Sequence, residues 1–283
     1  MLYLWIVAAL GWGCTSGKPP KAQESGCNGH PELCERSLDR VTLAGTHNSM
    51  SNEDEGWLAP NQGFGIERQL KDGIRAMMLD AVDWEGEPYL CHGPCELGAE
   101  PLADGLAKIE SFLVAQPGQV VVVIFQDALS VETMVEVMEA VGLSRRVWTW
   151  DGETVPLPTL GALIDAETNL VILGESGHPP PAWYHHAWDL VTDTPYDFRG
   201  SDDFSCDLYR GESSNPLFLV NHWVSRPLPD AEMADVVNQA ETLGGRARRC
   251  GEERGRRVNI LAVDHYDRGD IFLVVDQLNG LAP

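Results

Sequence analysis

The sequence predicts an α/β fold in the form of a TIM-like (β/α) barrel, either closed or incomplete and distorted. Six short apolar runs recur along the chain, and most are separated by segments of helical character. Near-continuous apolar strands that alternate with helices are typical of a parallel sheet buried on both faces. Six or more such units within one domain favour a barrel.

The expected elements alternate along the chain. The predicted strands are residues 41–44, 76–79, 120–125, 170–173, 217–220 and 260–263. The predicted helices are residues 65–71, 101–115, 131–141, 157–164 and 231–243. No second linker and no internal repeat interrupt the chain after Leu38, so we expect residues 38–283 to form one domain.

Polar side chains follow directly on these apolar runs. They are His47, Asn48, Asp80, Gln126, Asp127, Glu175, Asn221, His222, Asp264 and His265. In (β/α) barrels the active site lies at the carboxyl ends of the strands. Each of these residues alone is more often a capping or loop residue, but together they predict a shared site at one rim.

The amino-terminal segment predicts export. Residues 2–13 are apolar and end at Cys14, and this run is shorter than the roughly 20 residues that span a bilayer. With Gly13 before Cys14, the pattern resembles a bacterial lipoprotein signal, although no Lys or Arg precedes the apolar run. We expect residues 1–14 to be a signal peptide with lipidation at Cys14, giving a cell-envelope lipoprotein anchored in the membrane. A plain secretory signal or a mis-assigned start codon is the alternative.

Residues 15–33 are rich in Gly, Pro, Lys and Ser, and we expect residues 15–37 to be a tether. Beyond Cys14 six cysteines remain, an even number that suggests three bridges in an exported chain. Proximity along the chain favours the pairs Cys27–Cys34, Cys91–Cys95 and Cys206–Cys250. A zinc site at Cys91 and Cys95 is the rival interpretation, but no matching second pair is present.

The formal net charge of −23 excludes some partners. Such a field repels nucleic acid and anionic bilayers at long range, so we expect no nucleic-acid partner. We also expect a monomer. An anionic substrate needs a local cation, which protonated His, Arg or a metal ion could supply.

An ordered set of short motifs lies in residues 43–93. Gly45-Thr-His-Asn-Ser49 closes the first strand, Gly73-Ile-Arg75 leads into the strand that ends in Met78-Leu-Asp80, and His92-Gly93 follows. As a set they resemble the X region of phosphatidylinositol-specific phospholipase C, within the PLC-like phosphodiesterase superfamily. A weaker similarity continues through residues 121–127 and 259–270, so the resemblance covers most of the chain after Leu38.

The resemblance implies that His47 and His92 are catalytic. Cleavage of a phosphodiester needs one group that takes a proton from the nucleophile and another that protonates the leaving oxygen. Imidazole titrates near neutrality and can fill either role. We assign His47 as the base or a phosphate-stabilising donor and His92 as the general acid, and we expect Asp264 to orient a histidine or a substrate hydroxyl. The alternatives are a core histidine and, for Asp264, an ion pair with Arg268.

The resemblance also implies a way of meeting the phosphate charge. In the metal-using branch Ca²⁺ is held by an Asn beside the first His and by carboxylates, and Asn48 and Asp80 match, with Asp127 as a further tentative ligand. Met78 and Gln126 stand where that branch has Glu, and Val82 stands where the metal-free branch has Arg. We expect a divalent cation, with Ca²⁺ as the candidate, although two positions of the ligand set of that branch carry no carboxylate here. Substrate or phosphate contacts are expected from Arg75, Asn221 and His222.

The sequence therefore predicts a phosphoric diester hydrolase that cleaves a phospholipid or a related small phosphodiester. One alternative is a glycerophosphodiester phosphodiesterase, which the missing Glu at Met78 disfavours. The other is a barrel lipoprotein that has lost catalysis and acts as a binding module.

Overall fold

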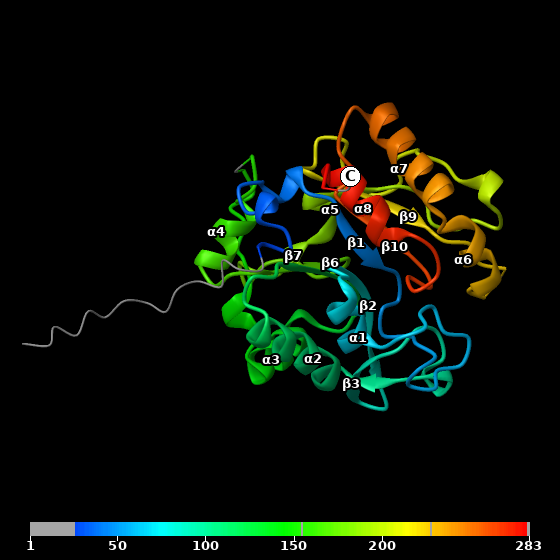
Figure 1. Ribbon diagram of the computed structural model, residues 1–283. Helices are drawn as coiled ribbons and strands as arrows, with labels where there is room; N and C mark the ends of the chain where they lie inside the picture. The colour runs from blue at the N-terminus through cyan, green and yellow to red at the C-terminus, as the bar shows by residue number, and fades with distance from the viewer. Residues whose placement is uncertain (1–25, 154, 227, 282–283) are drawn as a thin grey trace, which may run out of the picture.

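A computed structural model describes residues 26–153, 155–226 and 228–281. Its centre is a curved sheet in which eight strands run parallel (Figure 1). These strands are β1 (Leu43–Thr46), β2 (Ala76–Trp84), β5 (Val121–Ala128), β6 (Leu170–Gly174), β7 (His185–His186), β8 (Val191–Asp193), β9 (Leu217–His222) and β10 (Ile260–Val263). All six predicted strand runs lie in this sheet.

The sheet forms an incomplete barrel. Its strand order is β7-β6-β5-β2-β1-β10-β9-β8, so the amino-terminal strand β1 lies at the centre beside β2 and β10. The two short edge strands β7 and β8 are joined by helix α5 (Ala187–Leu190) but do not pair with each other. The predicted (β/α) barrel is confirmed in its incomplete form.

Helices flank the sheet, and most of them cover its outer face (Figure 1). They are α1 (Ile66–Asp72), α2 (Leu102–Ala115), α3 (Val131–Val141), α4 (Leu160–Asp165), α6 (Ala231–Val237), α7 (Ala240–Arg254) and α8 (Ile271–Asn279). The predicted helix over residues 231–243 is wrong in extent. It is divided between α6 and α7, because the chain turns at Asn238, whose side chain donates to the backbone oxygens of Asp264 and His265.

Side-chain alternation along the strands separates two cores. On β2, Met77 and Leu79 pack in the outer cluster with helices α1 and α2, whereas Ala76 and Met78 belong to the cluster inside the barrel. Successive side chains of a strand point to opposite faces. Continuing this period of two places Asp80 at the inner mouth of the barrel, where the strands end.

A hairpin outside the parallel sheet follows β2. Strand β3 (Glu87–Leu90) pairs antiparallel with β2, and β4 (Glu100–Pro101) pairs antiparallel with β3. The sequence did not predict these strands. The hairpin brings the residues that follow Leu90 back over the mouth of the barrel, because Leu90 pairs with Ala81.

The three predicted disulfides are present, namely Cys27–Cys34, Cys91–Cys95 and Cys206–Cys250. The predicted start of the domain differs from the structure, because Cys27 and Leu33 are buried in the inner cluster and residues from 26 onward belong to the folded part. The expected signal peptide and Cys14 lie outside the described residues. No helix within the described residues is long and apolar enough to cross a membrane.

Candidate active site

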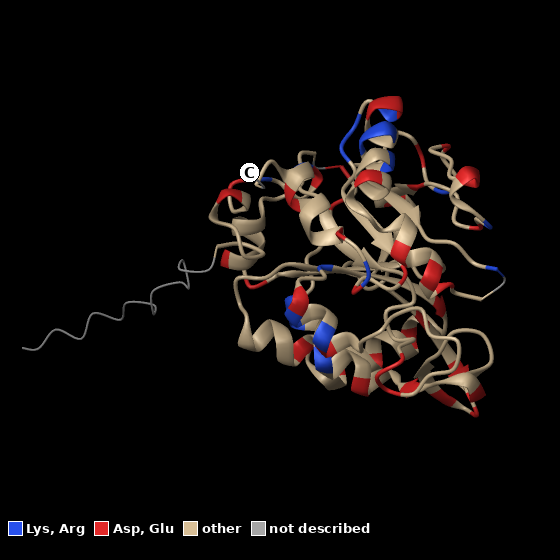
Figure 2. Ribbon diagram, turned by 45° about the vertical axis from the view of Figure 1, so that its right-hand side comes forward, with Lys and Arg blue, Asp and Glu red and all other residues tan. Residues whose placement is uncertain are grey.

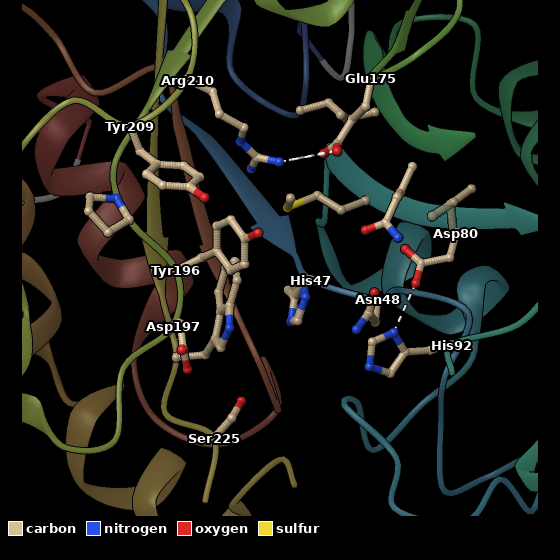
Figure 3. A pocket seen from close by; sticks show the side chains of 16 residues that line it. His47, Asn48, Asp80, His92, Glu175, Tyr196, Asp197, Tyr209, Arg210 and Ser225 are labelled. Atoms are coloured by element: carbon tan, nitrogen blue, oxygen red, sulfur yellow. Dashed lines mark hydrogen bonds and ion pairs between the residues drawn. The ribbon is translucent and has the colours of Figure 1, made fainter. Parts of the chain in front are cut away.

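A cavity of about 460 Å³ opens at the carboxyl ends of the strands (Figure 3). Its lining comes from β2 and β5 and from the loops that follow β1, β3, β6, β8 and β9. The lining residues are His47, Asn48, Met78, Leu79, Asp80, His92, Ile124, Gln126, Glu175, Pro195, Tyr196, Asp197, Tyr209, Arg210, Trp223 and Ser225. The rim predicted from the strand ends therefore contains a cavity with both expected catalytic histidines in it.

His47 is held on three sides. It directly follows β1, and its backbone N–H donates to the carbonyl of Val263 at 3.0 Å. Its Nδ1 lies 2.9 Å from Oδ1 of Asp264, and its ring stacks on Trp223 with centroids 3.9 Å apart and planes 4° apart. The side-chain amide of Asn61 donates to both carboxylate oxygens of Asp264 at 3.1 Å, which fixes that carboxylate.

This arrangement sets the tautomer of His47. A carboxylate accepts, so neutral His47 carries its proton on Nδ1 and leaves the lone pair of Nε2 free. Asp264 thus orients a histidine, as expected, and the alternative ion pair with Arg268 is absent because Arg268 bonds to Asp235 at 2.8 Å. Sequence reasoning missed Asn61 and the stacking role of Trp223, since neither position follows from a strand pattern.

His92 faces His47 from the hairpin loop. Its Nδ1 lies 2.8 Å from Oδ2 of Asp80, and the two imidazole centroids are 6.3 Å apart with planes at 70° (Figure 3). The hydrogen bond to Asp80, with further Coulomb attraction from Asp80 and Asp264, raises the pKa of His92 against the opposing effect of burial. The raised pKa extends the pH range over which the ring is protonated, and in that form its Nε2–H is left to donate.

The two imidazoles are chemically inequivalent. His47 is buried on most sides, with 18 % of its side chain exposed, whereas 48 % of the His92 side chain is exposed. One ring can accept a proton at Nε2 while the other donates one, and their separation leaves a gap between them. This is the geometry that acid–base catalysis on a small bridging group requires.

An arginine that the sequence analysis missed lies at the far end of the cavity. The Nη1 of Arg210 bonds to Glu175 at 3.0 Å (Figure 3). Its Nη2 bonds to Asp193 at 2.6 Å. Its guanidinium also lies over the rings of Trp188 and Tyr196, at 4.0 and 4.9 Å. Burial raises the pKa of both carboxyl groups. Arg210 follows β8, a three-residue strand too short to predict, so no sequence pattern placed it here.

The lining does not fit the expected divalent cation. Asn48 and Asp80 do line the cavity, but Asp80 already accepts from His92, and the adjacent Met78 and Gln126 bring no charge. Ca²⁺ prefers six to eight oxygen ligands, with carboxylates among them. Among the residues that the structure describes, no group of three His, Cys, Asp or Glu side chains could hold a metal ion.

Two expected site residues lie elsewhere. Asp127 accepts from the backbone N–H groups of Ser176 and Gly177 and from the hydroxyl of Tyr184, so its assignment as a metal ligand is wrong. Arg75 precedes β2 at the amino end of the sheet, and its Nη1 donates to the carbonyls of Leu70 and Ile74. Its assignment to phosphate binding is also wrong, because the cavity opens at the opposite end of that strand.

Asn221 and His222 are likewise structural. Both are fully buried and neither lines the cavity. The Asn221 amide donates to Asp193, and Nε2 of His222 donates to the carbonyl of Val237 at 2.9 Å. Burial, with repulsion from Arg246, lowers the pKa of His222 to about 3, so this ring is neutral. The substrate contacts predicted for these two residues are therefore wrong.

Acidic residues surround the site on a molecule whose net charge is −23. Asp and Glu side chains are spread over its helices and loops, and Lys and Arg are fewer (Figure 2). Arg210 is the only Lys or Arg in the lining, and two carboxylates neutralise it. The ring of His92, by contrast, bonds to the single carboxylate of Asp80.

Comparisons with known proteins identify relatives across the whole domain. A family model described as PI-PLC X 1 matches residues 33–279. The chain is 27 % identical to an uncharacterized secreted protein of Arthroderma benhamiae over 94 % of this chain and 67 % of that protein. It is 25 % identical to a PI-PLC X domain-containing protein 1 of the same organism, over 99 % of this chain and 97 % of that protein.

Solved structures share the fold. The F249X mutant of phosphatidylinositol-specific phospholipase C from Staphylococcus aureus superposes with a TM-score of 0.58 at 14 % identity, over 88 % of this chain and 94 % of that chain. A second structure of that enzyme, from work on its membrane binding, gives a TM-score of 0.59 at 15 % identity, over 88 % and 95 %. At this identity the similarity shows the fold alone.

Proposed function

Because the chain belongs to the PI-PLC X family, we propose that it is a phospholipase C-like phosphodiesterase in which His47 and His92 are the acid–base pair. The observation that carries the proposal is the pair of facing imidazoles, 6.3 Å apart, each with a carboxylate on Nδ1. Matching carboxylates leave both Nε2 atoms for the substrate. A histidine with a structural role alone does not require a carboxylate on Nδ1 and a free Nε2 that faces a second such ring.

In the proposed reaction His47 acts first. Its Nε2 takes the proton of the attacking hydroxyl, which belongs either to the substrate itself or to water, as the oxygen–phosphorus bond forms. Asp264 stabilises the imidazolium that results. His92 gives its Nε2 proton to the leaving oxygen as the second oxygen–phosphorus bond breaks, and Asp80 keeps that ring protonated beforehand. The step leaves His47 protonated and His92 neutral, and both rings return to their starting states by exchanging protons with solvent water before the next turnover.

The phosphate charge is met by His92 in this proposal. Among the described residues no three His, Cys, Asp or Glu side chains are placed to hold a metal ion, and Arg210 is paired with Glu175 and Asp193. The imidazolium of His92 starts the reaction with the positive charge that an anionic phosphodiester needs. No metal takes part in any step.

The proposed substrate is a phospholipid or a related glycerol or inositol phosphodiester. The Arg210–Glu175 pair offers donors and acceptors at the deep end, and Tyr196 and Tyr209 offer ring faces beside it. The hydroxyl groups of a polyol head group would bond to the Arg210–Glu175 pair, and its ring would pack on Tyr196 and Tyr209. Such pairing of polar groups with flat apolar faces suits a polyol.

Assay of the purified mature protein tests the function. Phosphatidylinositol, phosphatidylcholine, glycerophosphodiesters and a 4-nitrophenyl phosphodiester are each incubated with and without EDTA. We expect cleavage of at least one lipid or glycerol diester at an unchanged rate in EDTA, read as released phosphate ester. Loss of activity on chelation contradicts the metal-free reaction, and no cleavage of any substrate favours a binding module.

We also propose that the protein is exported and anchored through Cys14. Three disulfides are typical of exported chains, and one fungal relative is named a secreted protein. The net negative charge does not favour binding of the protein to a lipid surface, and a lipid on Cys14 would hold the cavity near that surface. Mass spectrometry of the mature amino terminus separates a lipidated Cys14 from a plain secretory cleavage.

A further inference from the structure

The two histidines of the site are positioned by different means. His47 belongs to the end of a central strand and is held by Asp264 and by the stacked ring of Trp223. His92 lies in the loop between β3 and β4, outside the parallel sheet, and among the described residues Asp80 is the only side chain bonded to its ring. With 48 % of its side chain exposed, His92 depends on its own backbone for its place.

That backbone is anchored at both ends of the loop. At one end Cys91 is 1 % exposed, and its N–H donates to the carbonyl of Asp80 at 3.2 Å. At the other end the carbonyl of Leu97 accepts from the N–H of Leu58 at 2.7 Å, and Gly98 packs against the ring of Trp57.

Between the anchors the chain has little other support. Residues 92–94 are exposed, and Gly93 has a φ of +67°, which glycine tolerates without strain. Within the described part of the chain, neither the N–H of His92 nor that of Gly93 donates a backbone hydrogen bond. The Cys91–Cys95 disulfide closes the loop over this stretch and leaves three residues between its ends.

We propose that the Cys91–Cys95 disulfide positions the general acid His92 for the reaction. This inference rests on the proposed phosphodiesterase function. The bridge ties the unsupported residues to buried Cys91, whose own neighbour in space is Asp80, the partner of the His92 ring. Cys91 and Cys95 are positioning residues, since they act through His92 and do not touch the reacting atoms.

The other disulfides have different surroundings. Cys27–Cys34 lies at the amino end of the sheet, where Asn28 bonds to Gly118 ahead of β5. Both bridges close short loops, with a sequence separation of 7 for Cys27–Cys34 and of 4 for Cys91–Cys95. The loop that Cys27–Cys34 closes contains no residue that lines the cavity. Cys27–Cys34 is therefore the matched control for removal of a short-loop bridge.

The test removes each bridge by double alanine substitution. For Cys91→Ala/Cys95→Ala we expect kcat on a diester with an alkyl leaving group to fall about 10- to 100-fold, as misplacement of a catalytic group by about 1 Å does. KM should rise as well, because the displaced imidazolium is also the cation that meets the charge of the bound phosphate. Cys27→Ala/Cys34→Ala should lower the unfolding temperature and leave kcat of the folded protein unchanged.

Two further comparisons separate positioning from general damage. In a His92→Ala background, removal of the Cys91–Cys95 bridge should cost no additional activity, because the group that it positions is gone. With a 4-nitrophenolate leaving group, which departs without protonation, the loss should be small. An equal loss in both backgrounds, or with both leaving groups, overturns the inference.

A measurement that does not depend on turnover tests this inference separately from the proposed function. NMR titration of the imidazole C–H signals should show the pKa of His92 falling when the bridge is removed, because its bond to Asp80 loosens, while the His47 signal is unchanged. An unchanged His92 titration contradicts the inference even in a protein without activity. Should the alanine pair not fold, Cys91→Val/Cys95→Ser, which refills the buried site, serves for the same measurements.

Discussion

Replacing either histidine with alanine is expected to lower kcat by roughly 10²–10⁴-fold, the range for loss of one general acid or base. His47→Ala removes the group that accepts the nucleophile's proton, and His92→Ala removes both the acid and the cation that meets the phosphate. The His92→Ala variant should therefore also raise KM, whereas His47→Ala should act mainly on kcat. Steady-state kinetics on the best substrate, with circular dichroism as the check on folding, measure both effects.

The matched control is His178→Ala. His178 is exposed outside the cavity, and its ring contacts the carbonyl of Pro179. Its replacement should leave both kinetic constants unchanged. Activity of His47→Ala or His92→Ala at the level of this control would remove the basis of the proposed mechanism.

Replacing Asp80 with asparagine is expected to move the alkaline limb of the kcat profile to lower pH. Asp80 is the largest cause of the raised pKa of His92, whose ordinary value is 6.5. A general acid works while protonated, so activity is present below the pKa of His92 and is lost as the pH rises through it. The neutral amide of Asp80→Asn lowers that pKa, and activity should disappear at a lower pH than in the wild type.

At a fixed pH above neutrality the same variant should lose about 10²-fold in kcat, because a poorly held acid loses most of its catalytic contribution. Asp83→Asn is the control, since Asp83 lies on the same strand and accepts only from Gly86 in an exposed turn. A profile of Asp80→Asn that coincides with that of Asp83→Asn would show that His92 is not the titrating acid.

The fold could be predicted because its central strands are buried on both faces. Val121–Phe125 and the other apolar runs read as strands without tertiary information, and their alternation with helices gave the barrel. The two edge strands β7 and β8 were beyond prediction. They have two and three residues, and their pairing with β6 and β9 depends on tertiary contacts.

Strand geometry explains two of the misplaced site residues. Asp127 and His222 continue the outer faces of β5 and β9, in phase with the outward-packed Phe125 and Val220. Successive side chains alternate between faces, so a polar residue just past a strand points into the barrel at only every second position. Asp127 and His222 were predicted as site residues because they lie at strand ends. They do not line the cavity, because their side chains point to the outer face of the sheet.

The barrel and the two histidines were predictable because burial patterns and short motifs are local properties of the chain. The surroundings of those histidines were not, because they depend on residues far apart in the sequence. Asp264 lies 217 residues from His47, and Arg210 lies 35 residues from Glu175. Contacts of this kind depend on how separate strands converge at one rim, and no local pattern of residues encodes that convergence.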